Sequence, residues 1–171
     1  MGSFTLLLGG ARSGKSTLAV EAGRRHGGDV VVIATAEPVD DDMAARIARH
    51  RAERPGWPVI EEPVRLADAI RNAPAEALVI VDCVTVWVAN LLHHGVDLRI
   101  EPVVDALVSR AGPAVVISNE VGLGVVPASE SGRQYRDLIG AANQRLAAAA
   151  TNTLFMVAGR AVRLDDPWAL L

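Results

Sequence analysis

The residues Gly9-Gly10-Ala11-Arg12-Ser13-Gly14-Lys15-Ser16 decide the fold of this chain, together with the segments on either side of them. An apolar run at 4–8 precedes them, and a stretch of good helix formers at 17–22 follows. In the pattern Gly-x4-Gly-Lys-Ser, the glycines let backbone N–H groups surround a phosphate, the lysine reaches the outer phosphates and the hydroxyl binds Mg²⁺. A loop that ends at a helix N-terminus also favours anions. The sequence therefore predicts a phosphate-binding loop between a strand and a helix.

The rest of the chain alternates between apolar runs and helical patterns. The apolar runs lie at 4–8, 30–34, 78–81, 114–117 and 154–157, with weaker ones at 59–60 and 162–164. Helical patterns lie at 16–26, 41–54, 64–71, 85–93, 102–110 and 133–150. Because the apolar runs are continuous, they are typical of parallel strands that are buried on both faces. We predict one α/β domain over residues 1–171, with a mostly parallel sheet flanked by helices.

Composition excludes several classes of protein. The net charge of −3 gives no global attraction to nucleic acid, and the single cysteine rules out an internal disulfide. No apolar run approaches the roughly 20 residues of a membrane span, and no signal peptide is recognisable. We therefore expect a cytoplasmic protein with neither nucleic-acid nor membrane partners. Lys15 is the only lysine in the sequence, which strengthens its assignment to phosphate binding.

Asp82 follows the apolar run 78–81 directly. In many nucleotide-binding proteins a carboxylate at the end of such a strand holds Mg²⁺, either directly or through a water molecule. The alternative is an aspartate that happens to begin a loop. We predict that Ser16 and Asp82 together bind Mg²⁺.

The expected helix at 41–54 places a histidine between arginines. At helical spacing Arg46, His50 and Arg54 share one side of this helix. One interpretation is a solvated basic face. The other is a reactive site, because neighbouring positive charges hold an imidazole in its neutral form, and a neutral imidazole is the nucleophile or general base. The residues alone leave both interpretations open.

Six segments together resemble one known family. They are GGARSGKS at 9–16, IATA at 33–36, DDDMAARIARHRAERP at 40–55, VDCVTVWVANLL at 81–92, SNEVGLGVVP at 118–127 and RQYRDLIGAANQRLAAAA at 133–150. The chain resembles the bifunctional adenosylcobinamide kinases and adenosylcobinamide-phosphate guanylyltransferases of cobalamin biosynthesis. The resemblance covers nearly the whole chain in order, and departs from the family pattern at Asn152-Thr153 and over 159–164.

The resemblance implies a RecA-like P-loop sheet with one site for two reactions that need Mg²⁺. In the first, ATP or GTP phosphorylates the aminopropanol hydroxyl of adenosylcobinamide. In the second, GMP passes from GTP to that phosphate through a GMP–histidine intermediate, and pyrophosphate is released. The matching histidine is His50, and Lys15 is the second expected catalytic residue.

The resemblance also implies nucleotide contacts outside the phosphate loop. The matching residues are Ala34, Thr35, Ala36, Arg51, Ala52, Glu53, Arg54 and Glu62. The carboxylate of Glu62 would accept hydrogen bonds from the N–H groups of guanine, with Glu61 as an adjacent competitor. Nothing catalytic is expected at the C-terminus. The resemblance further implies a homo-oligomer, with a trimer described for this type of fold, whereas the preferred phosphoryl donor and the corrinoid-binding residues stay open.

Two other functions fit part of the sequence. One is a simple P-loop kinase of small molecules without nucleotidyl transfer, which would need no histidine in the arginine-rich helix. The other is a nucleotide-dependent switch. The guanine-reading Asn-Lys-x-Asp element of such switches is absent, because the chain has no lysine besides Lys15.

Overall fold

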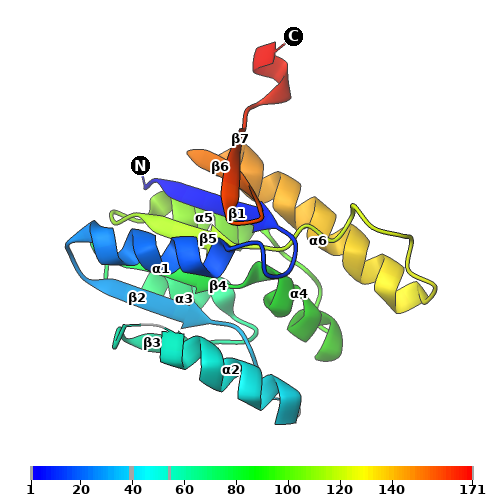
Figure 1. The fold of residues 1–171 in the computed structure, drawn as a ribbon, viewed down its shortest axis with the longest axis horizontal. Coiled ribbons are helices and arrows are strands. Elements are labelled where there is room, and N and C mark those ends of the chain that lie inside the picture. Colours follow the sequence, from blue (N-terminus) through cyan, green and yellow to red (C-terminus); the bar gives the residue numbers. More distant parts are fainter. Residues whose placement is uncertain (1, 39–40, 54, 171) are drawn as a thin grey trace.

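The strands in the described residues all belong to one sheet. In this computed structural model, which describes residues 2–38, 41–53 and 55–170, the seven strands have the order β3-β2-β4-β5-β1-β6-β7 (Figure 1). The strands are β1 (Phe4–Gly9), β2 (Val30–Ala34), β3 (Val59–Glu61), β4 (Leu78–Asp82), β5 (Ala114–Ile117), β6 (Asn152–Val157) and β7 (Arg160–Leu164). Every pairing from β3 to β6 is parallel, and β7 alone pairs antiparallel with β6. This confirms the predicted mostly parallel α/β sheet.

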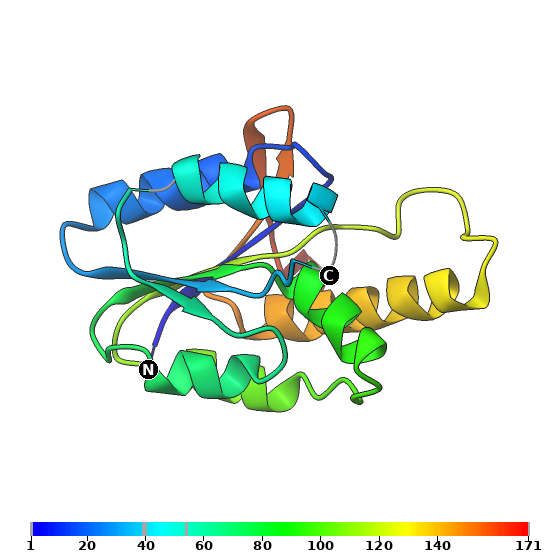
Figure 2. The same ribbon diagram turned by 90° about the horizontal axis from the view of Figure 1, so that it is seen from below.

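Helices cover both faces of the sheet. They are α1 (Lys15–His26), α2 (Asp41–Glu53), α3 (Leu66–Asn72), α4 (Val84–His93), α5 (Glu101–Ser109) and α6 (Glu130–Ala149). Figure 2 shows α1 and α2 on one face and α3, α5 and α6 on the other. Within α2 the side chains of Asp42, Met43, Arg46, Arg49, His50 and Glu53 lie outside the described part of the structure. In the described residues, no helix is long and apolar enough to cross a lipid bilayer.

Helix boundaries differ from the sequence pattern where local capping decides them. Helix α6 begins at Glu130, three residues before the expected position 133, because the Ser129 hydroxyl accepts a hydrogen bond from the N–H of Gly132 at 3.1 Å. Helix α3 begins at Leu66 instead of at 64, since the N–H groups of Val64 and Arg65 donate to the Glu62 side chain. The first difference comes from a side-chain cap and the second from side-chain hydrogen bonds in the preceding loop, and an apolar pattern reveals neither.

The two faces of the sheet carry cores of different size. The larger core lies under α3 to α6, and its sheet residues that are least exposed are Leu6, Ile33, Val79, Val81 and Val116. The smaller core, under α1, is formed by the alternate positions of the same strands, such as Leu7, Val32 and Ile80. The strands are therefore buried on both faces, as their continuous apolar sequences predict.

The chain ends beyond the sheet edge. Strand β7 and the short 3₁₀ helix η1 (Pro167–Leu170) are exposed along their whole length, and Figure 1 shows η1 projecting away from the sheet. The turn from β6 to β7 has positive φ at Ala158 and Gly159, the backbone that suits a two-residue hairpin. The sequence predicted the strand at this position, but its pattern did not show that it runs antiparallel.

Buried Arg110 supports the packing of α3 against the sheet. Its guanidinium donates to the backbone carbonyls of Ile70, Pro74 and Ala77, each at 2.9 Å. Burial lowers the pKa of this guanidinium from its ordinary value.

We expect Arg110→Ala to lower the free energy of unfolding by about 1–3 kcal/mol, because it leaves buried carbonyl groups without donors. Chemical denaturation of both proteins measures the difference. The control is Arg71→Ala, which removes a half-exposed arginine from α3 and should cost less than about 1 kcal/mol. Equal losses in the two variants would contradict the structural role of Arg110.

Candidate nucleotide site at the carboxyl edge of the sheet

The parallel strands bring their carboxyl ends to one edge, and the predicted site residues gather there. The register pairs Ala34 of β2 with Asp82 of β4, and Asp82 with Ile117 of β5. Strand β1 ends at Gly9, where the phosphate loop begins. In open α/β sheets, ligands bind at this edge. The topology therefore places the phosphate loop, Asp82 and the segment from Ala34 to Ala36 around one region.

The glycines of the phosphate loop are required by its backbone. Gly9 has φ +144°, and a Cβ atom built there would lie 2.3 Å from the carbonyl oxygen of Met156. Gly14, at the N-cap of α1, has φ +101° and a Cβ position 3.2 Å from the Cα of Gly159. Arg12 also has positive φ, at 57°. No residue with a Cβ fits at Gly9 without moving the backbone of β6.

Lys15 is buried and held over the loop from which it comes. Its Nζ donates to the carbonyl oxygens of Gly9 at 2.9 Å and Gly10 at 2.6 Å, and lies 3.2 Å from the Ser13 hydroxyl. Burial lowers the pKa of the Lys15 ammonium, while the neighbouring acidic groups, including Asp82, oppose this shift. These acceptors point the ammonium into the loop, where an outer phosphate would bind.

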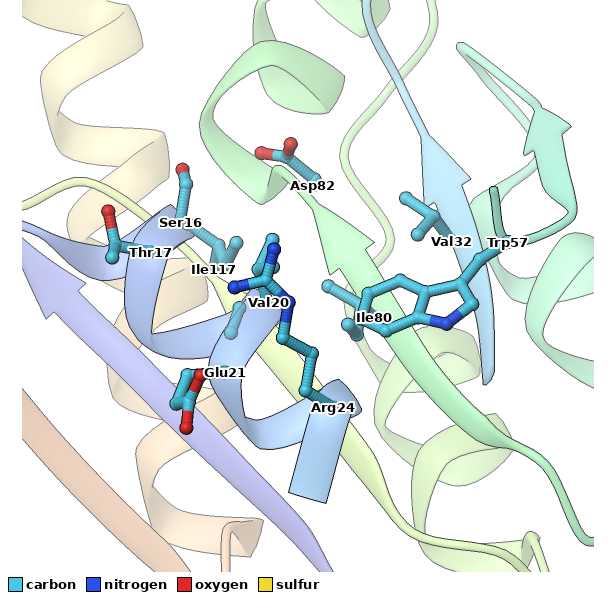
Figure 3. A pocket seen from close by; sticks show the side chains of 11 residues that line it. Ser16, Thr17, Val20, Glu21, Arg24, Val32, Trp57, Ile80, Asp82 and Ile117 are labelled. Atoms are coloured by element: carbon cyan, nitrogen blue, oxygen red, sulfur yellow. The ribbon is translucent and has the colours of Figure 1, made fainter. Parts of the chain in front are cut away.

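Ser16 and Asp82 carry oxygen atoms, the type of ligand that a magnesium ion prefers. Figure 3 shows the hydroxyl of Ser16, in the first turn of α1, and the carboxylate of Asp82, at the end of β4, at the same end of one pocket. Among the described residues, no group of three or more His, Cys, Asp or Glu side chains could hold a metal. Magnesium commonly takes only one or two protein ligands and completes its shell with water and phosphate oxygens. The donor set therefore suits Mg²⁺ bound together with a nucleotide.

The hydroxyl of Thr35, directly after β2, is hydrogen-bonded to the backbone of Cys83, directly after β4. It donates to the carbonyl of Cys83 at 2.8 Å and accepts from the N–H of Cys83 at 3.0 Å. The side-chain amide of Asn90, in α4, donates to the carbonyls of Thr35 at 2.7 Å and Pro63 at 3.1 Å. Burial and the negative charge of Asp82 raise the pKa of the Cys83 thiol to about 11, so this cysteine is not a thiolate at neutral pH. The segment is thus rigid, with the Thr35 hydroxyl turned inward.

Glu61 and Glu62, the two glutamates considered for guanine recognition, have different partners in the structure. Glu61, at the end of β3, pairs with Arg51 of α2. Glu62 Oε1 accepts from the N–H groups of Val64 at 3.1 Å and Arg65 at 2.8 Å. Burial alone would raise the pKa of Glu62, but these backbone donors and the Arg65 charge lower it on balance. Glu62 is therefore an ionised carboxylate.

Helix α2 carries most of the other predicted nucleotide contacts. Arg51 and Ala52 are exposed. His50 and Glu53 lie on α2, but their side chains are outside the described part of the structure, and Arg54 is outside the described residues. The roles of these residues stay predictions.

Comparison with known proteins identifies the family. Residues 5–164 match the family described as cobinamide kinase / cobinamide phosphate guanyltransferase. The chain belongs to this family. It is 43% identical to the bifunctional adenosylcobalamin biosynthesis protein CobP of Pseudomonas aeruginosa, over 90% of this chain and 92% of that protein. It is 36% identical to the bifunctional adenosylcobalamin biosynthesis protein CobU of Escherichia coli K12, over 93% of this chain and 98% of that protein.

A solved structure supports the fold. A type III secretion system ATPase of pathogenic bacteria superposes with a TM-score of 0.53 at 16% identity, covering 91% of this chain. This chain spans about half (51%) of the length of that ATPase. At this identity the likeness concerns the fold alone, and it agrees with the RecA-like P-loop sheet that the resemblance implied.

Sequence reasoning missed two supports of the phosphate loop in this family member. The N–H of Gly159, in the β6–β7 turn, donates to the Ser13 carbonyl at 2.9 Å. The N–H of Glu120, after β5, donates to the Gly9 carbonyl at 3.2 Å. Glu120 lies in a segment that resembles the family, which was a usable signal, but no pattern at Gly159 indicated its contact with the loop. The β6–β7 hairpin therefore supports the phosphate loop from outside.

We expect Gly9→Ala to lower the free energy of unfolding by at least about 1–3 kcal/mol, since alanine is strained at this φ and its Cβ meets the backbone of Met156. Gly10→Ala is the matched control. A Cβ at Gly10 has nothing within 4 Å, so stability should change by less than about 0.5 kcal/mol. Urea denaturation without nucleotide separates these effects from ligand binding. A Gly9→Ala protein as stable as Gly10→Ala would show that the loop backbone adapts.

Proposed function

We propose that the chain catalyses both reactions of its family at this edge: phosphorylation of adenosylcobinamide by ATP or GTP, then transfer of GMP from GTP to the product. The observation that carries the proposal is the phosphate loop with buried Lys15 beside Asp82, in a chain that belongs to this family. We also propose that residues 1–171 act as one domain, in the cytoplasm and as a homo-oligomer. The resemblance to the family supports these three points.

In the first reaction, the loop Gly9–Ser16 would hold the triphosphate. Its backbone N–H groups and the N-terminus of α1 favour the phosphate charges, and Lys15 would lie against the outer phosphates. Ser16 and Asp82 would hold Mg²⁺, which supplies charge neutralisation between the β- and γ-phosphates. The hydroxyl of the acceptor attacks the γ-phosphorus, the bond to the β-phosphate oxygen breaks, and the nucleoside diphosphate leaves.

In the second reaction, the neutral imidazole of His50 would attack the α-phosphorus of GTP. A phosphorus–nitrogen bond forms and pyrophosphate leaves. A phosphate oxygen of the acceptor then attacks the same phosphorus, the phosphorus–nitrogen bond breaks, and the imidazole is released with GMP on the acceptor. The arginines that share a helical face with His50 in the sequence would favour its neutral form and offset the developing charge.

Recognition of the nucleotide would involve Ala34, Thr35, Ala36, Arg51, Ala52, Glu53, Arg54 and Glu62. Since the Thr35 hydroxyl is bonded to Cys83, the backbone and methyl groups of this segment would face the nucleotide. The oxygen Oε1 of Glu62 is bound by two backbone N–H groups, whereas among the described residues Oε2 meets only the mostly exposed guanidinium of Arg65, at 3.4 Å. We assign Oε2 as the acceptor for the N–H groups of guanine.

We expect His50→Ala to abolish guanylyl transfer and to keep the kinase reaction, because only the second reaction uses the imidazole. Lys15→Ala should slow both reactions by about 10²–10³-fold, since both need the triphosphate to be held. One assay with adenosylcobinamide, Mg²⁺ and α- or γ-labelled GTP follows both products. Guanylyl transfer by a folded His50→Ala protein would refute the assignment of His50 as the nucleophile. If the unsubstituted protein phosphorylates adenosylcobinamide but transfers no GMP, the simple kinase is favoured.

We expect Glu62→Gln to raise the KM for GTP in the transferase reaction by about 10-fold or more, because the charged acceptor for the N–H groups of guanine is lost. Glutamine keeps a carbonyl oxygen for the N–H groups of Val64 and Arg65, so the loop before α3 should persist. Glu61→Gln is the control and should leave the KM for GTP unchanged. If Glu61→Gln raises the KM for GTP instead, the assignment of guanine recognition to Glu62 is wrong.

A further inference from the structure

A cavity of about 310 Å³ lies between α1 and the sheet, and the roles proposed above leave most of it unused. Its floor is apolar and comes from three strands, through Val32, Ile80 and Ile117. Helix α1 forms one wall, and Trp57, in the segment before β3, forms the opposite one (Figure 3). Such an apolar pocket with a few polar groups is the usual form of a ligand site.

We propose that this cavity binds the short hydroxyl-bearing arm of the acceptor, cobinamide, during phosphorylation and again when the arm carries its phosphate. The inference rests on the proposed function and adds the position of the acceptor. Its first support is location. One end of the cavity is formed by Ser16 and Asp82, the residues proposed to hold Mg²⁺, which would supply charge neutralisation at the outer phosphates. An arm in the cavity would present its hydroxyl beside the phosphorus that is transferred.

The shape of the cavity depends on a close contact between α1 and Trp57. A Cβ atom on Gly23 would lie only 2.4 Å from Cη2 of the Trp57 ring. Only glycine at this position of α1 lets the indole approach so closely. The indole is half-buried and lies across the pocket from Val20, so it offers an apolar surface to an aliphatic arm.

Arg24 supplies a positive charge for the phosphorylated arm. Among the described residues it forms no ion pair, because its neighbour Glu21 pairs with Arg25 at 2.7 Å. Figure 3 shows the Arg24 side chain extending along α1 so that its guanidinium lies over Val20, inside the pocket region. A guanidinium matches the geometry of a phosphate better than an ammonium does. Arg24 is therefore suited to the substrate of the second reaction, whose arm carries a phosphate.

The volume decides which part of the acceptor enters. At 310 Å³ the cavity is at the lower end of the range of about 300–1,000 Å³ for small-molecule pockets. It accommodates an arm but not a corrin macrocycle. The macrocycle would remain outside, at the open side of the cavity.

The test uses Val20→Trp, which fills the cavity from α1, and Arg24→Ala, which removes the positive charge that lies over Val20. We expect Val20→Trp to raise the KM for cobinamide in the kinase reaction by about 10-fold or more, with GTP binding by calorimetry unchanged. Arg24→Ala should raise the KM for cobinamide phosphate in the second reaction by about 10-fold and affect the first much less. Arg145→Ala makes the same change of charge at an exposed position of α6, on the other face of the sheet, and should alter neither KM.

The outcomes separate the two proposals. If the unmodified chain binds GTP but phosphorylates no cobinamide, the proposed function fails. If it is active and both variants keep normal KM values, the cavity is a packing gap and this inference is wrong. Weaker GTP binding in Val20→Trp, without a change in the KM for cobinamide, would assign the cavity to the nucleotide instead. Thermal melting shows whether Val20→Trp is folded, and Arg24→Ala, which changes a solvent-exposed side chain, provides the test if it is not.

Discussion

The site depends on one buried ammonium and the loop that surrounds it. Lys15 donates to carbonyls of the same loop that would bind the phosphate, so the loop has its shape before any ligand arrives. Neighbouring elements fix this shape from outside, through the N–H of Gly159 on Ser13 and the N–H of Glu120 on Gly9. A loop ordered in advance loses little conformational entropy on binding, and its dipoles need no reorganisation during the reaction.

The unequal cores of the two sheet faces position the rest of the site. On the face of α3 to α6, large aliphatic residues and Trp87 fill the space between helices and sheet. On the other face, α1 covers a smaller core, and Trp57 reaches across it to Gly23. The cavity lies in this smaller layer, next to the carboxyl edge. The well-packed face therefore holds the strands rigid, while the thinner face has room for a ligand.

The sequence predicted those features that are encoded locally. The phosphate loop is a contiguous motif, and the strands are continuous apolar runs, so both could be located without any tertiary information. Features that depend on distant residues were not predictable. The close approach of Trp57 to Gly23, the pairing of Glu61 with Arg51 and the contact of Gly159 with Ser13 each join separate elements. The start of α6 at Glu130 depends on a single hydroxyl, that of Ser129, which an apolar pattern does not register.

The γ-phosphorus is attacked in the first proposed reaction and the α-phosphorus in the second, with the nucleotide held in the same loop. Since the loop is rigid, the two attacking groups must approach from different positions. The cavity would bring the acceptor to the γ-phosphorus, and α2, which carries His50, lies on the same face of the sheet as α1 (Figure 2). The product of the first reaction is the acceptor of the second. An arm held between α1 and Trp57 could therefore stay bound while the spent nucleotide is exchanged for GTP, and under this proposal one small domain would suffice for both steps.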